Sequence, residues 1–343
     1  VQVCTLRDLV SWAGDLKVEQ DQAVARLKGS AAMVTAIEPA VRLYEEPPPY
    51  DLVVETPWGD LRLGAAGWAE AFGAPDPSTP HNDARDDVRD AIVEILVDRH
   101  DGDDDERDRL RRYLHRHPGI DEELGKSWPR LDPIDLVGDL WEVPAYLRRC
   151  APWLSHVEVQ RLQRERPHQW TISDMPLLDA ALMRLGDPDA GRRRQQEAAS
   201  RDAEWEEMSR VIEHLIASDD SNMKVMSMLR GLDMRNALAN GHDRPRSEVE
   251  LLAGPFEHIV VDEAQELTDA EWQMLIARCP SRSFTLAGDR AQARSGFFES
   301  WTERLDRVGL RDARRMLLNV NYRTPREVMA EAEPVIRSEF PGA

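Results

Sequence analysis

The sequence predicts an α/β fold in which a parallel sheet domain is interrupted by a large, mainly α-helical insertion. Short apolar runs at 259–261, 284–287 and 316–318 alternate with helical patterns, as the strands and helices of a parallel sheet do. The stretch of about 31–250 that precedes them carries mainly helical periodicity, apart from one hairpin-like piece. No repeat of fixed period is present, which excludes solenoids and propellers.

Composition sets limits on the class of protein. The 343 residues are enough for two or three domains, and a net charge of −20 argues against a surface that binds nucleic acid all over, although it leaves room for a local basic groove. Three cysteines, far apart, indicate neither a disulfide framework nor a zinc cluster. No apolar run approaches the roughly 20 residues that span a bilayer and no signal segment opens the chain, so we expect a soluble cytoplasmic protein.

The elements before residue 100 can be predicted in order. The opening "VQVCTLRDLV" predicts a strand that runs into a helix, and helical periodicity continues to about Tyr44. Three prolines and the alternation over 52–63 predict a linker followed by a β-hairpin. Thr79 and Pro80 then predict the cap and first position of an amphipathic helix.

Helices dominate the prediction from residue 100 to about 250. An acidic run at 100–108 separates two helices, and 128–153 is rich in Trp, Leu and Pro, as a helical piece with a small core of its own would be. Ser155 and Glu158 predict a capping box. A long polar helix is expected over about 192–217.

The stretch "FEHIVVDEAQELTD" carries the first chemical signal. Residues 259–261 predict a buried strand, and Asp262 and Glu263 stand where it ends. Ligand sites in open α/β sheets lie beyond the carboxyl ends of the strands. Asp262 is therefore a candidate Mg²⁺ ligand and Glu263 a candidate base for an attacking water. Thr268 and Glu271 predict the capping box of the next helix.

Two later stretches add polar side chains to the same predicted sheet edge. "SFTLAGDRAQ" ends in Gly288, Asp289 and Gln292, and "LLNVNYRTPREV" ends in Tyr322 and Arg323 before a capped helix. An arginine placed there can stabilise the charge that develops on a transferred phosphoryl group.

A glycine-rich phosphate loop does not accompany these stretches. The Gly-Lys-Ser at 125–127 follows Gly119 after five residues, whereas the phosphate loop requires four. The residues between, "IDEEL", place carboxylates where anionic phosphates would lie. We interpret 125–127 as part of a plain loop.

The three C-terminal stretches resemble motifs II, III and IV of superfamily 1 helicase-type ATPases, the group that includes the Rep and UvrD helicases. The resemblance implies a RecA-like fold of the P-loop NTPase type, with ATP and Mg²⁺ as cofactors. It implies that residues 1–30 and 251–315 belong to the first RecA-like domain, that 31–250 are inserted in it, and that 316–343 begin the second. The phosphate loop precedes motif II in this superfamily, so we expect the chain to be a fragment of a longer protein and to be unable to hydrolyse ATP alone.

Roles for single residues follow from the same resemblance. It implies that Asp262 and Glu263 bind the metal and that Glu263 is the general base for water. Gln265 couples the site to the neighbouring motifs, and Gln292 senses the γ-phosphate. The remaining implied roles are adenine stacking by Tyr322 and stabilisation of the transferred phosphoryl group by Arg323.

Other stretches, among them "VARLKG", "WTISDMPLLDAA" and "KVMSMLRGLDMRNAL", resemble the HelD family of RNA polymerase recycling ATPases. The resemblance implies a monomeric protein that binds core RNA polymerase, opens its clamp and releases stalled nucleic acid, and in some relatives protects against rifampicin. An acidic loop of the family enters the primary channel. Asp219 and Asp220 are the favoured candidates for it, and the acidic run at 101–106 is the other.

Two further functions stay open. The 40 arginines could line a single-strand groove in a Rep- or UvrD-type DNA helicase or translocase, for which interleaved aromatic residues would be expected. The arginines lie mainly in mixed-charge helices, which favours the polymerase-recycling hypothesis over the DNA translocase. The chain could also act only as a polymerase-binding module.

Overall fold

Two compact units make up the chain. A computed structural model describes residues 2–186, 252–294, 299–318 and 324–339. Unit 1 consists of Val1–Ile37, Val137–Ala180 and Leu252–Ala343, and unit 2 consists of Glu38–Leu136 and Ala181–Leu251. The described residues form a mixed α/β structure that is mostly helical and has two small sheets, as the α/β prediction requires at its coarsest level.

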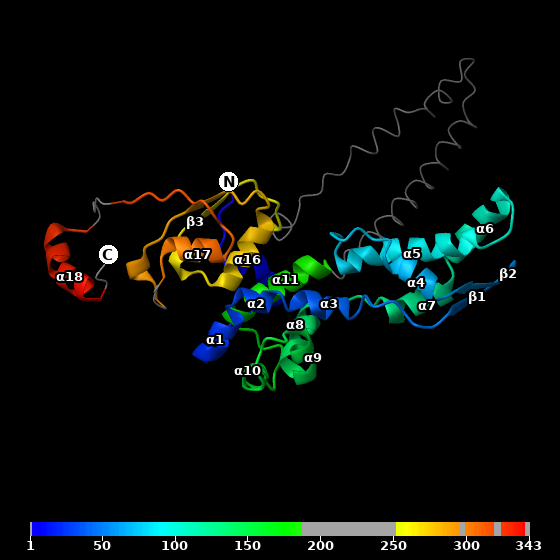
Figure 1. Ribbon diagram of the computed structural model, residues 1–343, viewed down its shortest axis with the longest axis horizontal. Coiled ribbons are helices and arrows are strands. Elements are labelled where there is room, and N and C mark those ends of the chain that lie inside the picture. Colours follow the sequence, from blue (N-terminus) through cyan, green and yellow to red (C-terminus); the bar gives the residue numbers. More distant parts are fainter. Residues whose placement is uncertain (1, 187–251, 295–298, 319–323, 340–343) are drawn as a thin grey trace, which may run out of the picture. The chain divides into compact units, whose positions relative to one another are not determined.

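The helices (α), 3-10 helices (η) and strands (β) of the described residues are labelled as in Figure 1. In chain order they are η1 Leu6–Ala13, α1 Gln22–Lys28, α2 Ala31–Val34, α3 Ile37–Arg42, β1 Leu52–Thr56, β2 Gly59–Leu63, α4 Ala65–Phe72, α5 His81–Asp98, α6 Asp104–Leu114, α7 Pro118–Ser127, α8 Pro133–Glu142, α9 Pro144–Cys150, α10 His156–Leu162, η2 Ile172–Asp174, α11 Met175–Leu185, β3 Ile259–Val261, η3 Ala264–Glu266, α16 Asp269–Arg278, β4 Phe284–Leu286, η4 Arg290–Gln292, α17 Trp301–Arg307 and α18 Arg326–Glu339. Among these described helices, none has both the length and the apolar character needed to cross a membrane.

Unit 2 is built on the predicted hairpin and the helices that follow it. Strands β1 and β2 pair antiparallel, with Val54 opposite Leu61 and Thr56 opposite Gly59. The turn needs a glycine, because Gly59 has a φ of 118°. Helices α4, α5, α6 and α7 follow the hairpin in unit 2 (Figure 1). They supply the rest of one core, in which Trp68 is fully buried. The alternation read from the sequence therefore predicted this hairpin correctly.

The amphipathic pattern predicted helix α5 correctly. Its apolar residues recur every three or four positions, so they fall on one face, and that face is buried. The fully buried or nearly buried members are Ala84, Val88, Ile92, Val93, Leu96 and Val97. The helix begins at His81 with Pro80 as its N-cap, one residue later than the predicted cap at Thr79.

Unit 1 contains the parallel pair of strands. Strand β3 pairs with β4 in the register Ile259 to Phe284 and Val261 to Leu286. Helices α16 and α17 cover the pair with apolar side chains, and Trp272 of α16 is fully buried in this core. As predicted, α16 begins with a capping box in which the Thr268 hydroxyl accepts from the Glu271 amide and the Glu271 carboxylate accepts from Thr268.

Both ends of α16 are held by other segments of unit 1. At its start the Ala270 amide donates to the carbonyl of Gly29 over 3.0 Å, and a Cβ at Gly29 would come within 3.2 Å of the Thr268 methyl group. At its end the buried guanidinium of Arg278 forms a bidentate ion pair with Asp179 of α11. The same side chain donates to the Leu252 carbonyl. The position of α16 is thus fixed by chain segments far apart in sequence.

A second buried charge cluster holds the helical part of unit 1 together. Lys28 is 1% exposed; its ammonium lies 2.8 Å from Asp174 Oδ1 and 5.0 Å from the ring centre of Trp141. Arg164 contacts the other Asp174 oxygen at 3.0 Å. Burial would raise the pKa of Asp174, but the two cations outweigh it and hold that pKa below its ordinary value.

Several predicted elements differ from the structure. Residues 2–5 are not a strand, and a 3-10 helix follows them. Met316, Leu317 and Leu318 are not in a strand either; they are 66–96% exposed, and none of the described strands pairs with them. The helix expected at 192–217 lies outside the described residues. The two units divide residues 31–250 between them, and the predicted domain boundaries stay a prediction.

Candidate functional site

The carboxyl ends of β3 and β4 lie side by side in unit 1. Because the strands are parallel and in register, the residues after Val261 and after Leu286 leave the sheet at one edge. The backbones stay joined beyond the strands, since the Ala287 amide donates to the Val261 carbonyl and the Ala264 amide donates to the Ala287 carbonyl. Two of the three predicted stretches therefore meet as expected.

Asp262 and Glu263 occupy the turn directly after β3, and both are exposed. The Asp262 carboxylate accepts from the Glu263 amide over 2.9 Å. Glu263 has φ 52° and ψ 37°, the left-handed conformation that costs a residue with a Cβ about 1–3 kcal/mol. The turn presents both carboxylates to solvent at the sheet edge.

Gln265 connects this turn to the loop after β4. Its side chain is buried, with the residue 5% exposed. Its amide nitrogen donates to the Glu263 carboxylate over 2.5 Å, and its amide oxygen accepts from the Asp289 backbone amide over 3.0 Å. A buried amide with both ends engaged has one favourable orientation. Gln265 thereby fixes the Glu263 carboxylate relative to the second loop.

Gln292 lies at the same edge, in η4. Its side chain is exposed and donates to the Asp289 carboxylate over 2.8 Å. A cavity of about 370 Å³ opens between the two loops, lined by Glu263, Glu266, Gln292 and Arg294. The structure thus brings together Glu263 and Gln292, which were predicted from separate stretches.

Two residues that line this cavity were not among the predicted site residues. Glu266 accepts from the Arg294 backbone amide over 3.0 Å, which joins the ends of the two loops. Glu266 directly follows "DEAQ", and Arg294 comes two residues after Gln292, so proximity in sequence was the signal available for both.

The structure does not describe four of the predicted site residues, and it gives part of the second acidic run a helical conformation. Tyr322, Arg323, Asp219 and Asp220 lie outside the described residues. The other acidic run, at 101–106, overlaps the start of α6, where Asp103 caps the helix by accepting from the Glu106 amide over 2.8 Å. Carboxylates in a first helical turn are stabilised by the helix dipole, so much of this run has a structural explanation.

The Gly-Lys-Ser at 125–127 is a helix end, not the plain loop that was predicted. Helix α7 starts at Pro118 and includes all three residues, and Lys126 pairs with Glu122 one turn earlier. A helix of this kind cannot wrap backbone amides around phosphates. The prediction that these residues are no phosphate loop is confirmed, and their conformation is corrected.

The residues at the sheet edge fit a magnesium ion only together with other ligands. Among the described residues, no three His, Cys, Asp or Glu side chains converge as a metal cluster. Mg²⁺ is commonly held by one or two carboxylates, with water and substrate phosphates completing its octahedron. The exposed Asp262 carboxylate suits that arrangement.

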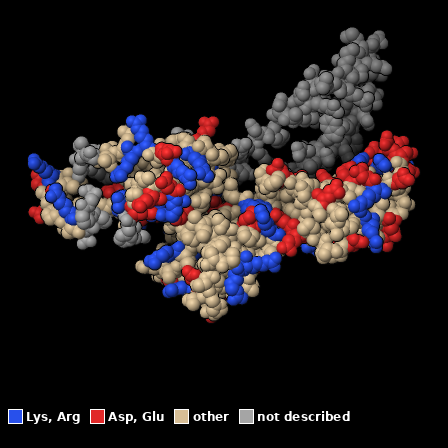
Figure 2. Space-filling view, in the orientation of Figure 1, with Lys and Arg blue, Asp and Glu red and all other residues tan. Residues whose placement is uncertain are grey.

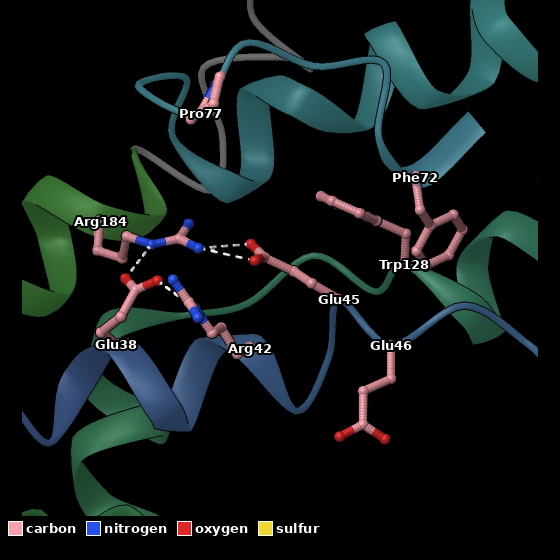
Figure 3. Close-up of a pocket in the computed structure, with 8 residues that line it drawn as sticks. All are labelled: Glu38, Arg42, Glu45, Glu46, Phe72, Pro77, Trp128 and Arg184. Atoms are coloured by element: carbon pink, nitrogen blue, oxygen red, sulfur yellow. Dashed lines mark hydrogen bonds and ion pairs between the residues drawn. The ribbon is translucent and has the colours of Figure 1, made fainter. Parts of the chain in front are cut away.

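A second cavity, of about 510 Å³, lies in unit 2 (Figure 3). Arg184 stands between Glu38 and Glu45, with its Nε 2.7 Å from Glu38 and its Nη2 2.7 Å from Glu45, and Arg42 pairs with Glu38. The remaining lining residues are Glu46, Phe72, Pro77 and Trp128. Burial would raise the pKa of Glu45, but hydrogen bonds from His81 and Arg184 outweigh it and lower that pKa.

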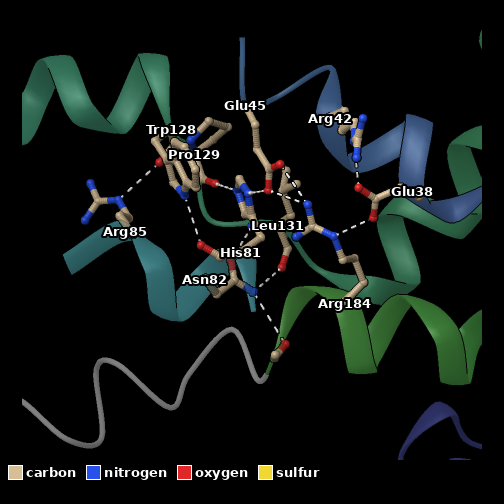
Figure 4. A network of polar contacts seen from close by, with 11 residues as sticks. Glu38, Arg42, Glu45, His81, Asn82, Arg85, Trp128, Pro129, Leu131 and Arg184 are labelled. Carbon is tan, nitrogen blue, oxygen red and sulfur yellow. Dashed lines mark hydrogen bonds and ion pairs between the residues drawn. The ribbon is translucent and has the colours of Figure 1, made fainter. Parts of the chain in front are cut away.

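A polar network that includes several residues of this cavity stabilises the fold of unit 2 (Figure 4). The buried His81 ring lies 3.0 Å from Glu45 through Nδ1 and 2.8 Å from the Pro129 carbonyl through Nε2, and it stacks on Trp128. Asn82 exchanges two hydrogen bonds with the Leu131 backbone. These contacts tie the start of α5 to the loop after α7, which explains the charges without a ligand.

No model of a known protein family matches the chain, and no curated protein matches it.

Proposed function

We propose that this chain carries the metal-binding and water-activating part of a helicase-like ATP hydrolase with a RecA-like domain. The observation that supports it best is the buried Gln265 bridge, which joins the Glu263 carboxylate to the loop after β4 at the carboxyl edge of a parallel strand pair. Phosphoryl transfer depends mainly on charged groups that are held in position. The Glu263 carboxylate, held by the buried Gln265 amide, is such a group.

Each residue has a distinct task in this proposal. Asp262 would hold a magnesium ion, which would supply positive charge near the phosphate oxygens. Glu263 accepts the proton of the attacking water, and its exposure at the cavity gives that water access. Gln292 contacts the terminal phosphate from the other loop. Tyr322 stacking on adenine and Arg323 at the phosphoryl group complete the proposal from the sequence resemblance.

We propose core RNA polymerase as the partner, with recycling of stalled complexes as the task and rifampicin tolerance as a consequence in the cell. In this proposal residues 31–250 form the inserted polymerase-binding region, residues 1–30 and 251–315 the first RecA-like domain, and 316–343 the start of the second. The net charge of −20 supports a protein that competes with nucleic acid for basic channels in the cytoplasm. Figure 2 shows acidic side chains gathered over α6 of unit 2.

The experiment uses the full-length protein. ATP hydrolysis and retention of core RNA polymerase are measured for wild type, for Glu263→Gln, and for the matched control Glu257→Gln, an exposed carboxylate that precedes β3. Loss of a general base predicts that Glu263→Gln lowers hydrolysis about 100-fold or more while ATP binding is kept. The control is expected to match wild type.

Two results would overturn parts of this proposal. Equal hydrolysis by wild type and Glu263→Gln would remove Glu263 from the chemistry. Absence of polymerase binding, together with salt-sensitive binding of single-stranded DNA, would assign the protein to the translocase class instead.

A further inference from the structure

Gly288 occupies a position where no side chain fits. A Cβ built on it would lie 2.7 Å from the amide oxygen of Gln265 and 2.9 and 3.0 Å from two ring carbons of Trp301. The backbone at Gly288 is therefore in close contact with the Gln265 amide and with an indole ring of helix α17. The next residue, Asp289, is the one whose amide donates to Gln265.

Helix α17 is itself fixed to the loop after β3. Arg304 Nη1 donates to the Leu267 carbonyl over 2.7 Å, and Arg307 pairs with Asp269 at 2.7 and 3.0 Å. Leu305 and Val308 of the same helical segment are buried in the core that contains β3 and β4. The helix thus contacts the β3 loop through Arg304, the start of α16 through Arg307 and the β4 loop through Trp301.

We propose that Trp301 is a positioning residue for Glu263. Trp301 acts on Glu263 through the Gly288 backbone, the Asp289 amide and Gln265. This inference rests on the proposed function. The indole keeps the Gly288 backbone pressed toward Gln265, so the Asp289 amide stays within hydrogen-bonding distance of the Gln265 oxygen. Gln265 then holds the Glu263 carboxylate in its left-handed turn. A smaller side chain at 301 frees the β4 loop to move away, because protein cores do not tolerate a gap without rearrangement.

The test compares Trp301→Leu with Leu305→Val in the full-length protein. Both variants remove core volume from α17, but only the first removes the contact with Gly288. The readouts are amide hydrogen exchange at Asp289, the unfolding midpoint, and kcat and KM for ATP. We expect Trp301→Leu to speed exchange at Asp289 about tenfold and to lower kcat about 10- to 100-fold with little change in KM. Leu305→Val is expected to leave exchange and kcat near wild type.

The outcomes separate this inference from the function on which it rests. Unchanged exchange at Asp289 in Trp301→Leu overturns the positioning role. Faster exchange with an unchanged kcat also overturns it, provided that Glu263→Gln abolishes hydrolysis. A fully folded wild-type protein that hydrolyses no ATP, alone or with core RNA polymerase, overturns the proposed function and with it the role of Trp301.

Discussion

Replacing Asp179 by asparagine removes the only carboxylate described in contact with the Arg278 guanidinium in unit 1. Asp179 Oδ1 and Oδ2 lie 2.5 and 2.7 Å from Arg278 Nη2 and Nη1, and the two side chains are 2% and 4% exposed. Two carbonyl contacts, to Leu252 and Met274, would remain. They do not neutralise the buried charge.

The expected cost is large because one partner of a buried pair stays charged. Breaking such a pair typically costs about 3–5 kcal/mol, whereas replacing both partners by apolar residues of similar volume is often nearly neutral. We therefore expect Asp179→Asn to lower the free energy of unfolding by about 3 kcal/mol and Asp179→Leu combined with Arg278→Met to recover most of that loss.

The assay is urea unfolding followed by tryptophan fluorescence and circular dichroism. With a slope of about 2 kcal/mol per molar urea, the loss corresponds to a midpoint shift of about 1.5 M. Glu333→Gln serves as the control, since its pair with Arg337 is 55–76% exposed, and its midpoint should match wild type. A shift for Asp179→Asn no larger than that of the control would show that the buried pair with Arg278 does not stabilise unit 1.

Three more predictions concern the sheet edge and its surroundings. Gly288→Ala should reduce ATP hydrolysis of the full-length protein at least tenfold, because its Cβ would collide with Gln265; Gly125→Ala, where no atom lies within 4 Å, should leave the rate unchanged. Asp262→Asn should raise the Mg²⁺ concentration needed for half-maximal hydrolysis, and an unchanged Mg²⁺ dependence would speak against a ligand role. Hydrogen bonds from Arg307 and Arg304 hold the pKa of Glu299 at about 2, below its ordinary 4.5. The stabilisation is thus complete above pH 4.5 and lost as pH falls toward 2, so the difference in unfolding free energy between wild type and Glu299→Gln should vanish over that range.

Local patterns predicted the elements whose causes are local. The hairpin of β1 and β2 follows from alternation beside a proline-rich linker, and the start of α16 follows from the Thr268 and Glu271 capping box. The strand β3 and the acids after it follow from an apolar run that ends in Asp262 and Glu263. In each case the signal lies within a few residues of the element.

The contacts that complete the site depend on segments far apart in sequence. Whether Gln265 would face Glu263 or solvent depends on the Asp289 amide, which a parallel pairing with β4 brings within reach. The Asp179 and Arg278 pair joins residues 99 positions apart. No local spacing encodes either contact, so sequence reasoning could propose the residues but not their arrangement.

Two of the failed predictions have different origins. The apolar run at 316–318 has the composition of a strand, yet a strand needs a neighbour, and none of the described strands pairs with it. The interpretation of 125–127 as a plain loop failed for a local reason, because Pro118 at the first position and the pairing of Lys126 with Glu122 favour a continuous helix.

The rate of ATP hydrolysis by the full-length Gln265→Glu variant, measured beside wild type and Gln265→Ala, tests the role of the buried amide most directly. The substitution keeps the size of the side chain but replaces the amide donor with a carboxylate next to Glu263. We expect Gln265→Glu to lose hydrolysis at least as completely as Gln265→Ala, by about 100-fold, while the protein remains folded. Hydrolysis at the wild-type rate in Gln265→Glu would contradict the claim that the buried amide positions Glu263.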